Sequence, residues 1–309
     1  MLVYDRPMRA FILPGFGEAP VLRDDVPEPA PGDTEVLVRV QASSINPVDS
    51  AIAAGMLDGM VEHVFPVTLG RDYAGVVEQA GSGVGGVTAG DTVFGFIRHA
   101  DPTVRDGSWA ELITVPATAR VPDGVDIAAA GAAPLAGITA LAAIDALELS
   151  SGDRVLIVGA TGGVGSFAVQ LAAHAGATVV APALPEDEEY LRGLGAGELP
   201  VRDDDLSGLD GVDALLDVVS YTPEALGVYE VALKPGGRVA SPIGAAGDGP
   251  GRTNVMALPT AANLERLGAV LADGTLAVPI RRSYGLAQAG DGLQALAAEH
   301  TQGKLGLTI

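Results

Sequence analysis

The 309-residue sequence contains no cysteine. This absence excludes disulfide scaffolds, cysteine-ligated zinc and thiol nucleophiles. Positive charge is also scarce, because 18 Lys and Arg residues stand against 39 Asp and Glu residues, for a formal net charge of −21. Such a charge repels nucleic-acid phosphates and anionic lipid headgroups. We therefore expect neither nucleic acid nor a membrane surface as a partner.

Long apolar runs are missing as well. The sequence has no stretch of about 18 uncharged apolar residues, and its first twenty residues carry charges and prolines where a secretory signal needs an unbroken apolar core. We expect a soluble, cytoplasmic protein. Because 48% of the residues are hydrophobic and only 18% are charged, the chain has enough apolar material for roughly two folded domains.

The sequence pattern changes near residue 126. Before it, short alternating or β-branched runs separated by Gly, Pro and Asp predict a mostly β domain. After it, alanine-rich helical stretches alternate with apolar strands, which predicts a parallel α/β sheet. The last residues return to the first pattern, so we expect a discontinuous first domain. The predicted strands are 36–40, 73–79, 92–96, 112–115, 155–158, 178–180, 214–219 and 238–241, and the main helical stretches are 127–147, 164–175 and 261–272.

Residues 154–165, RVLIVGATGGVG, form a buried strand followed by a glycine turn that opens an alanine-rich helix. In a dinucleotide site, Gly162 allows the backbone to approach a pyrophosphate and Gly165 allows close packing of helix on strand. The free N–H groups and the dipole of the helix stabilise the negative charge. Ala160 occupies the first glycine position of the usual motif. A purely structural turn is the alternative, but the order of strand, turn and helix favours a dinucleotide site.

Five further stretches identify a family. They are SINPVD at 44–49, GRDYAGVV at 70–77, GSWAE at 107–111, PLAGITA at 134–140 and LKPGGR at 233–238. Together they resemble the medium-chain dehydrogenase/reductase superfamily, in particular its zinc-free quinone oxidoreductase branch, over nearly the whole chain. The resemblance implies an α/β fold. A GroES-like, mostly β catalytic domain would comprise 1–126 and 275–309, and a Rossmann domain with a doubly wound parallel sheet would comprise 127–274.

The resemblance also implies the cofactor, NADP(H) by the preference of the family, with NAD(H) as the alternative. It assigns the cofactor contacts to Thr139, Val219, Ile243 and the glycine turn, which comprises Ala160, Thr161, Gly162, Gly163, Val164 and Gly165. It further implies a homodimer in which two Rossmann sheets join edge to edge through the strand near 238–243.

The residues expected to distinguish NADPH from NADH differ from those of the family. The Ser and Lys that hold the 2′-phosphate in the NADPH-using branch correspond here to Ala183 or Leu184 and to Asp187, and the acid of NAD-specific relatives corresponds to Pro182. Arg202 can supply a cation for the phosphate. The acidic run 186–189 would oppose a 2′-phosphate if it faced the site. The alternative is that these acids stabilise the first turn of a helix after Pro185.

The resemblance implies that the chain binds no zinc. Zinc-dependent relatives place Cys and His at the positions of Ile45 or Asn46 and of Arg71. The four histidines lie far apart in the sequence, without the spacing of metal ligands. We therefore predict no metal, and we expect the fixed hydrogen-bond donors of the protein and the cofactor itself to carry the chemistry.

The expected reaction is hydride transfer to a quinone or a conjugated enone, a small hydrophobic substrate. The resemblance places Asn46 beside the substrate, Asp49 nearby and Thr139 against the nicotinamide end of the cofactor. The alternative for residues 46–49 is an Asx-type turn or a helix cap, and both interpretations can hold. Some quinone reductases carry a tyrosine where this chain has Ala51, so Tyr73, Tyr221 or water remains as the proton donor.

Two other functions are compatible with the sequence. An enoyl-thioester reductase of the same superfamily would use the same hydride step and would need a basic entry for the phosphates of its carrier, for which Arg98, Arg105, Arg281 and Arg282 are available. A non-catalytic dinucleotide-binding sensor or crystallin-like protein would bind the cofactor without oxidising it.

Overall fold

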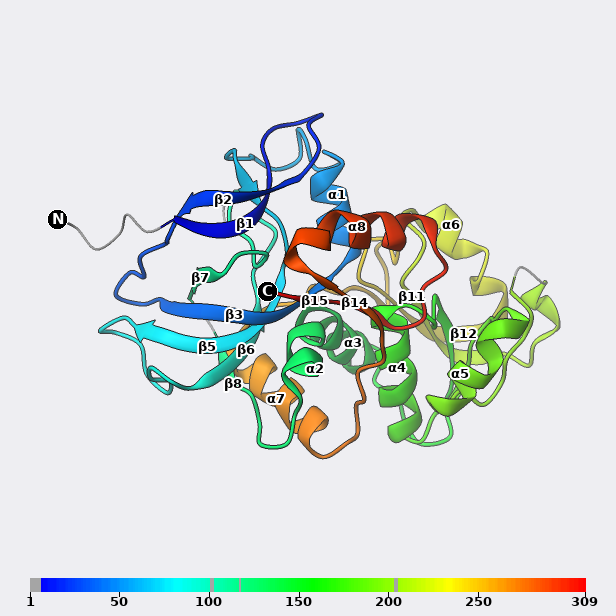
Figure 1. Cartoon of the computed structure of the whole chain (residues 1–309). Helices are drawn as coiled ribbons and strands as arrows, with labels where there is room; N and C mark the ends of the chain where they lie inside the picture. Colours follow the sequence, from blue (N-terminus) through cyan, green and yellow to red (C-terminus); the bar gives the residue numbers. More distant parts are fainter. Residues whose placement is uncertain (1–6, 101–102, 117, 203–204) are drawn as a thin grey trace. The chain divides into compact units, whose positions relative to one another are not determined.

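The computed structural model describes residues 7–100, 103–116, 118–202 and 205–309 and has an α/β fold (Figure 1). The described residues form two compact units. Unit 1 comprises 7–135, 258–272 and 278–309, and unit 2 comprises 136–257 and 273–277.

Unit 1 is built on two sheets. Three strands pair in the order β2-β1-β4, and a larger sheet has the order β14-β15-β3-β5-β6-β8, with β7 also paired to β3. β15 runs antiparallel to β3, so the C-terminal part of the chain completes a sheet begun near its start. The strands are β1 (Pro7–Leu13), β2 (Val21–Pro27), β3 (Val36–Ile45), β4 (Val67–Thr68), β5 (Asp72–Ala80), β6 (Thr92–Phe96), β7 (Leu112–Val115), β8 (Ala119–Arg120), β14 (Ile280–Gly285) and β15 (Lys304–Thr308).

Two helices of unit 1 lie outside the boundaries expected from the sequence. The expected division assigned α2 and α7 to the nucleotide-binding domain. α2 buries Ala130, Gly131 and Ala132 and contacts β3 and β5, and α7 lies against β8, so both helices group with unit 1. The helices of this unit are α1 (Pro47–Ala53), α2 (Ile127–Ala132), α7 (Ala261–Ala272), η4 (Leu286–Gln288) and α8 (Ala289–Ala298).

Unit 2 contains the parallel sheet that the alternating pattern predicted. Its strand order is β10-β9-β11-β12-β13, and every pairing is parallel. β13 therefore forms the sheet edge, whereas we expected the strand near 238–243, now β12, to do so. The elements are β9 (Arg154–Val158), α4 (Gly163–His174), β10 (Thr178–Val180), η1 (Pro185–Asp187), α5 (Glu188–Gly193), η2 (Leu206–Gly208), β11 (Val212–Asp217), α6 (Pro223–Gly227), η3 (Glu230–Ala232), β12 (Leu233–Ser241) and β13 (Arg252–Asn254).

Pro134 divides the helical stretch expected at 127–147. The structure has two helices there, α2 and α3 (Pro134–Ala146), with Ala133 as the C-cap of the first. Proline favours the first turn of a helix, where its missing N–H is not needed, so a new helix begins at Pro134. Within the described part of the chain, no helix is both long and apolar enough to cross a membrane.

Three of the sequence motifs meet in the core of unit 1. The Trp109 side chain is fully buried and its indole N–H donates to the carbonyl oxygen of Ser44 at 3.2 Å. Gly70 has φ +90°, and a Cβ at this position would collide with the Trp109 ring. Glycine is therefore required where the chain turns under the indole, directly before Arg71 and Asp72.

We predict that Gly131→Ala destabilises the protein and Gly193→Ala does not. A Cβ on Gly131 in α2 would lie 2.7 Å from the Ala42 backbone, whereas a Cβ on Gly193 in α5 would meet no atom within 4 Å. Overpacking should lower the free energy of unfolding by about 1–3 kcal/mol, and the control should be neutral or more stable by about 0.5–1 kcal/mol. Urea denaturation of both variants measures this, and equal stabilities would contradict the packing described.

Candidate functional site

Asn46 and Asp49 stand at the start of α1, directly after β3. Asn46 is the N-cap residue, and the Asp49 carboxylate accepts a hydrogen bond from the Asn46 backbone N–H at 2.8 Å. The helix-cap interpretation is therefore confirmed. Asn46 is 4% exposed and Asp49 is fully buried, so both polar side chains need partners inside the protein.

The Asn46 amide has partners at both ends. Its Oδ1 accepts from the Lys304 ammonium at 2.6 Å, and its Nδ2 donates to Asp72 Oδ2 at 2.8 Å. A longer contact of 3.4 Å joins the same Nδ2 to Ser44 Oγ. Lys304 is the first residue of β15, 258 positions from Asn46, and is 3% exposed.

The Asp72 carboxylate connects four segments of unit 1. In addition to the Asn46 amide, it accepts the Ser44 hydroxyl at 2.6 Å and the Leu135 backbone N–H at 2.7 Å, and it forms an ion pair with Lys304 at 3.5 Å. These donors come from β3, from α1, from α3 and from β15. They replace the water that a fully buried carboxylate loses.

A second buried ion pair joins Asp49 to Arg71. Arg71 Nε lies 3.8 Å from Asp49 Oδ1, and neither atom has a hydrogen-bond partner among the described residues. Burial raises the pKa of Asp49 to about 7, although the charges of Arg71 and Lys304 oppose this rise. Burial likewise lowers the pKa of Arg71 and that of Lys304. Two acids and two bases thus share one desolvated site.

The structure does not place Tyr73 in this group. Its side chain is fully buried in an apolar cluster with Val38, Val40 and Val93, and desolvation raises its pKa. The proton-donor role expected for Tyr73 stays a prediction. Tyr221, the other candidate, lies in unit 2 and is 73% exposed.

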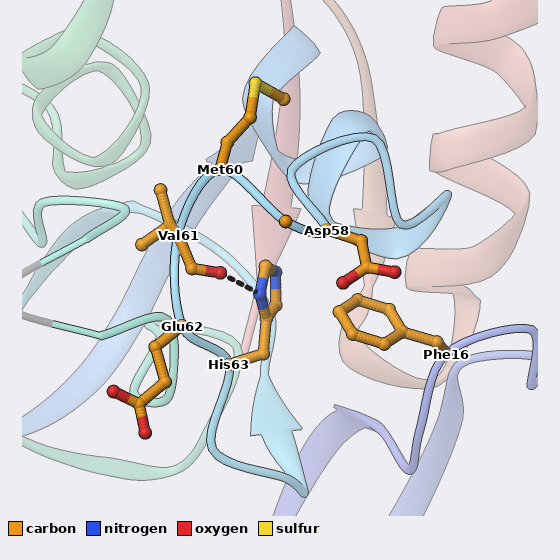
Figure 2. Close-up of a pocket in the computed structure, with 7 residues that line it drawn as sticks. Phe16, Asp58, Met60, Val61, Glu62 and His63 are labelled. Atoms are coloured by element: carbon orange, nitrogen blue, oxygen red, sulfur yellow. Dashed lines mark hydrogen bonds between the residues drawn. The ribbon is translucent and has the colours of Figure 1, made fainter.

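A cavity of about 260 Å³ opens in unit 1 beside the turn that follows α1 (Figure 2). The His63 Nδ1 hydrogen-bonds the Val61 carbonyl oxygen at 2.8 Å, and the ring packs edge-on against Phe16 at 4.8 Å between centroids. His63 is therefore packed among these residues. Met60 at the cavity is 68% exposed. The lining residues are Phe16, Asp58, Gly59, Met60, Val61, Glu62 and His63.

In unit 2, the glycine turn joins β9 to α4. Gly159 has φ +82°, and a Cβ on Gly165 would collide with the Gly159 carbonyl oxygen, so the start of α4 packs directly on the turn. A Cβ on Gly162 would meet no atom closer than 3.7 Å, so this residue leaves room above the helix start. Gly162 is the N-cap and provides no capping side chain. These features fit a pyrophosphate held by helix N–H groups.

Three of the other residues predicted for the cofactor lie at the same edge of the sheet as the glycine turn. Because all its strands are parallel, their carboxyl ends share one edge, where open α/β sheets bind ligands. Val219 follows β11 and Ile243 follows β12. Arg202 is tied to the segment after β10, since its N–H donates to the Ala183 carbonyl oxygen at 2.8 Å. Thr139 is buried on α3.

The acidic run 186–189 serves the helix start, as expected. Glu188 and Glu189 stand in the first turn of α5. Asp187 is fully buried, and its carboxylate lies 3.5 Å from the guanidinium of Arg202, which remains 32% exposed. The run therefore does not present all its charges to a ligand, and Arg202 compensates the buried one.

Four site residues were not assigned roles from the sequence. Lys304, Arg71 and Asp72 are buried ions, and a charged residue at the start of the apolar run KLGLTI is the signal that could have singled out Lys304. Asp217 ends β11, and its Oδ2 is buried without a hydrogen-bond partner in the described residues. Among all the residues that the structure describes, no group of three or more His, Cys, Asp or Glu side chains is arranged to hold a metal ion.

Two family models match the chain. Residues 32–123 match the alcohol dehydrogenase GroES-like domain, and residues 194–305 match a model described as zinc-binding dehydrogenase. Among solved structures, the quinone oxidoreductase from Coxiella burnetii aligns with a TM-score of 0.86 and 28% identity, covering 98% of this chain and 99% of that one.

Two curated plant proteins are also similar. The chloroplast envelope quinone oxidoreductase homolog of Arabidopsis thaliana is 37% identical over 193 residues, which cover 60% of this chain and 57% of that protein. The NADPH-dependent alkenal/one oxidoreductase of the same plant is 32% identical over 248 residues, which cover 77% and 63%. The match spans less than two thirds of either relative.

We predict that Asp49→Asn alters the pH dependence of stability. The pKa of Asp49 rises from 3.8 to about 7 on folding, so between these values the folded protein keeps a proton that the unfolded chain releases. Stability of the wild type should therefore fall, relative to the variant, as pH rises from about 4 to 7, and the difference should level off above pH 7. Denaturant unfolding at several pH values measures this. The exposed Asp24→Asn is the control, and parallel curves for wild type and Asp49→Asn would contradict the prediction.

We also predict that Gly162→Ala weakens dinucleotide binding without loss of stability. The added methyl group meets no protein atom closer than 3.7 Å but occupies the room above the start of α4. The dissociation constants of NADPH and NADH, measured by fluorescence titration, should rise about tenfold or more, equivalent to about 1.4 kcal/mol. Gly193→Ala should bind like the wild type. Unchanged affinity for both dinucleotides in the Gly162→Ala protein would show that the turn is not part of the binding site.

Proposed function

Because the chain belongs to the medium-chain dehydrogenase/reductase superfamily, we propose that it is an NAD(P)H-dependent oxidoreductase that reduces a quinone or a conjugated enone. The glycine turn between β9 and α4 carries this proposal, since its contacts require glycine at 165 and leave space at 162. The names of the similar proteins, a quinone oxidoreductase and an alkenal/one oxidoreductase, support the substrate class.

The cofactor would be held along the carboxyl edge of the unit 2 sheet. The backbone N–H groups at the start of α4, around Gly162, Gly163 and Val164, would bind the pyrophosphate. Val219, Ile243 and Thr139 complete the proposed contacts. When bound, NAD(P)H supplies a hydride to the acceptor.

On the acceptor side, Asn46 is the proposed catalytic residue. Reduction of a quinone or enone places negative charge on an oxygen distant from the carbon that receives hydride, and a fixed donor stabilises that charge. Asn46 offers an amide whose orientation is set by its partners, and Asp49 holds the Asn46 backbone in place. We propose water as the source of the proton, since the burial of Tyr73 disfavours that residue.

We propose that this chemistry needs no zinc. Zinc-dependent relatives are expected to carry their ligands at the positions of Ile45 or Asn46 and of Arg71, and Arg71 is a buried cation. The Lys304 ammonium lies between Asn46 and Asp72, at 2.6 and 3.5 Å. A positive charge already satisfies these oxygen atoms, which disfavours a divalent metal there.

Three further features remain proposals. We propose NADPH as the preferred cofactor, with Arg202 as the cation for the 2′-phosphate and NADH as the alternative. We propose a homodimer through β13, and the position of this strand at an edge of the sheet supports the proposal. A cytoplasmic location remains our prediction, although two of the similar proteins are named for the chloroplast.

The experiment is a steady-state assay of NADPH and NADH oxidation against a panel of quinones and enones, with and without enoyl thioesters. We expect turnover with quinones or enones. In Arg202→Ala, kcat/KM for NADPH should fall about tenfold while that for NADH is unchanged, because only NADPH carries the phosphate. Arg192→Ala, an exposed arginine of the same unit, is the control.

Three outcomes would contradict the proposal. Turnover with enoyl thioesters alone would favour the thioester reductase. Binding of both dinucleotides without oxidation by any acceptor would favour the sensor or crystallin-like protein. An equal loss for NADPH and NADH in Arg202→Ala would exclude Arg202 as the phosphate ligand.

A further inference from the structure

The orientation of the Asn46 amide is decided by charge. Lys304 can only donate, and it faces Oδ1 at 2.6 Å, whereas the Asp72 carboxylate accepts, and it faces Nδ2 at 2.8 Å. If the amide were flipped, its NH2 group would face the ammonium and its oxygen would face the carboxylate. Both contacts would be repulsive in a desolvated site, so only one orientation is stable.

This orientation leaves one N–H of Asn46 available. The two acceptors of Nδ2, Asp72 Oδ2 and Ser44 Oγ, are themselves 2.6 Å apart, so they lie on the same side of the amide nitrogen. One N–H can serve both of them. The second N–H points elsewhere, and no described residue accepts from it.

We propose that Lys304 is a positioning residue that, together with Asp72, fixes the Asn46 amide so that this second N–H is the hydrogen-bond donor for the substrate oxygen. The inference deepens the proposed function and rests on it for the identity of the substrate. The N–H donor of Asn46 suits a quinone or enone oxygen, because that oxygen accepts a stronger hydrogen bond as it gains negative charge.

The first test is a double-mutant cycle on kcat. Lys304→Met keeps the length of the side chain and removes the donor and the charge, so the amide is no longer fixed. We expect kcat to fall about tenfold or more, with little change in the dissociation constant of NADPH or NADH. Lys304→Arg should recover part of the loss, because it retains a cationic donor. Lys234→Met, a substitution of the exposed lysine that pairs with Asp213, should leave kcat unchanged.

The cycle separates positioning from stability. If Lys304 acts through Asn46, Lys304→Met should have no further effect on kcat in the Asn46→Ala background. If the two losses multiply, or if Lys304→Met lowers the melting temperature without lowering kcat, the positioning role is wrong. Should Lys304→Met fail to fold because Asp72 is left without its counter-charge, the Lys304→Met/Asp72→Asn double variant removes both charges and takes its place, with the same expected loss of kcat.

A second readout does not depend on turnover. In ¹⁵N-edited NMR spectra, the chemical shifts of the two Asn46 side-chain amide protons should change in Lys304→Met, because the amide loses the partner that fixes its orientation, but they should not change in Lys234→Met. Unchanged Asn46 resonances in Lys304→Met would overturn the inference. If the wild type turns over no quinone or enone, the proposed function fails, while the NMR result still decides whether Lys304 orients the amide.

Discussion

The buried Asp72 carboxylate is the interaction on which unit 1 depends. It receives donors from Ser44, Asn46, Leu135 and Lys304, and it is fully removed from solvent. A buried carboxylate costs several kcal/mol unless its oxygens are satisfied. The segments that bring these donors must therefore all be in place together, and Asp72 connects the end of β3 and the starts of α1, α3 and β15.

The packing around Asp72 also explains why position 70 is a glycine. Gly70 makes room for the Trp109 ring one residue before the ion network, and Trp109 in turn donates to the Ser44 carbonyl oxygen. The motifs at 44–49, 70–77 and 107–111 are therefore parts of one packed assembly. A substitution in any one of these motifs should disturb the packing of the other two, because the interior has little room to relax.

Much of this arrangement could be predicted from local sequence. The parallel sheet of unit 2 follows from apolar strands alternating with alanine-rich helices, and the turn at 159–162 follows from its glycines. The cap at Asn46 was one of two interpretations, and the structure supports it because Asp49 reaches back to the Asn46 N–H. These features depend on residues close together in the chain, where spacing and propensity carry the information.

Contacts between distant residues could not be predicted in this way. Nothing near Lys304 indicates that its partner is Asn46, 258 positions earlier, because only the antiparallel pairing of β15 with β3 brings them together. The complete burial of Tyr73 also depends on distant segments. The first four residues of its strand are all buried, because the packing of other segments, and not the local pattern, decides which of them are covered. The positions of helices and strands depend on local sequence, whereas the burial of a side chain depends on the assembled fold.

Because β15 lies near the C-terminal end of the sequence, its position also affects when unit 1 can complete its folding during synthesis. Asp72 and Asn46 leave the ribosome long before Lys304, and at about 5–20 residues per second the interval is roughly ten to fifty seconds. During this time, the residues of unit 2 between 136 and 257 are complete and can pack, while the carboxylate of Asp72 lacks its cationic partner. The part of the protein that is translated first is thus the part that finishes folding last, and a nascent-chain chaperone would find its exposed surface in the first unit.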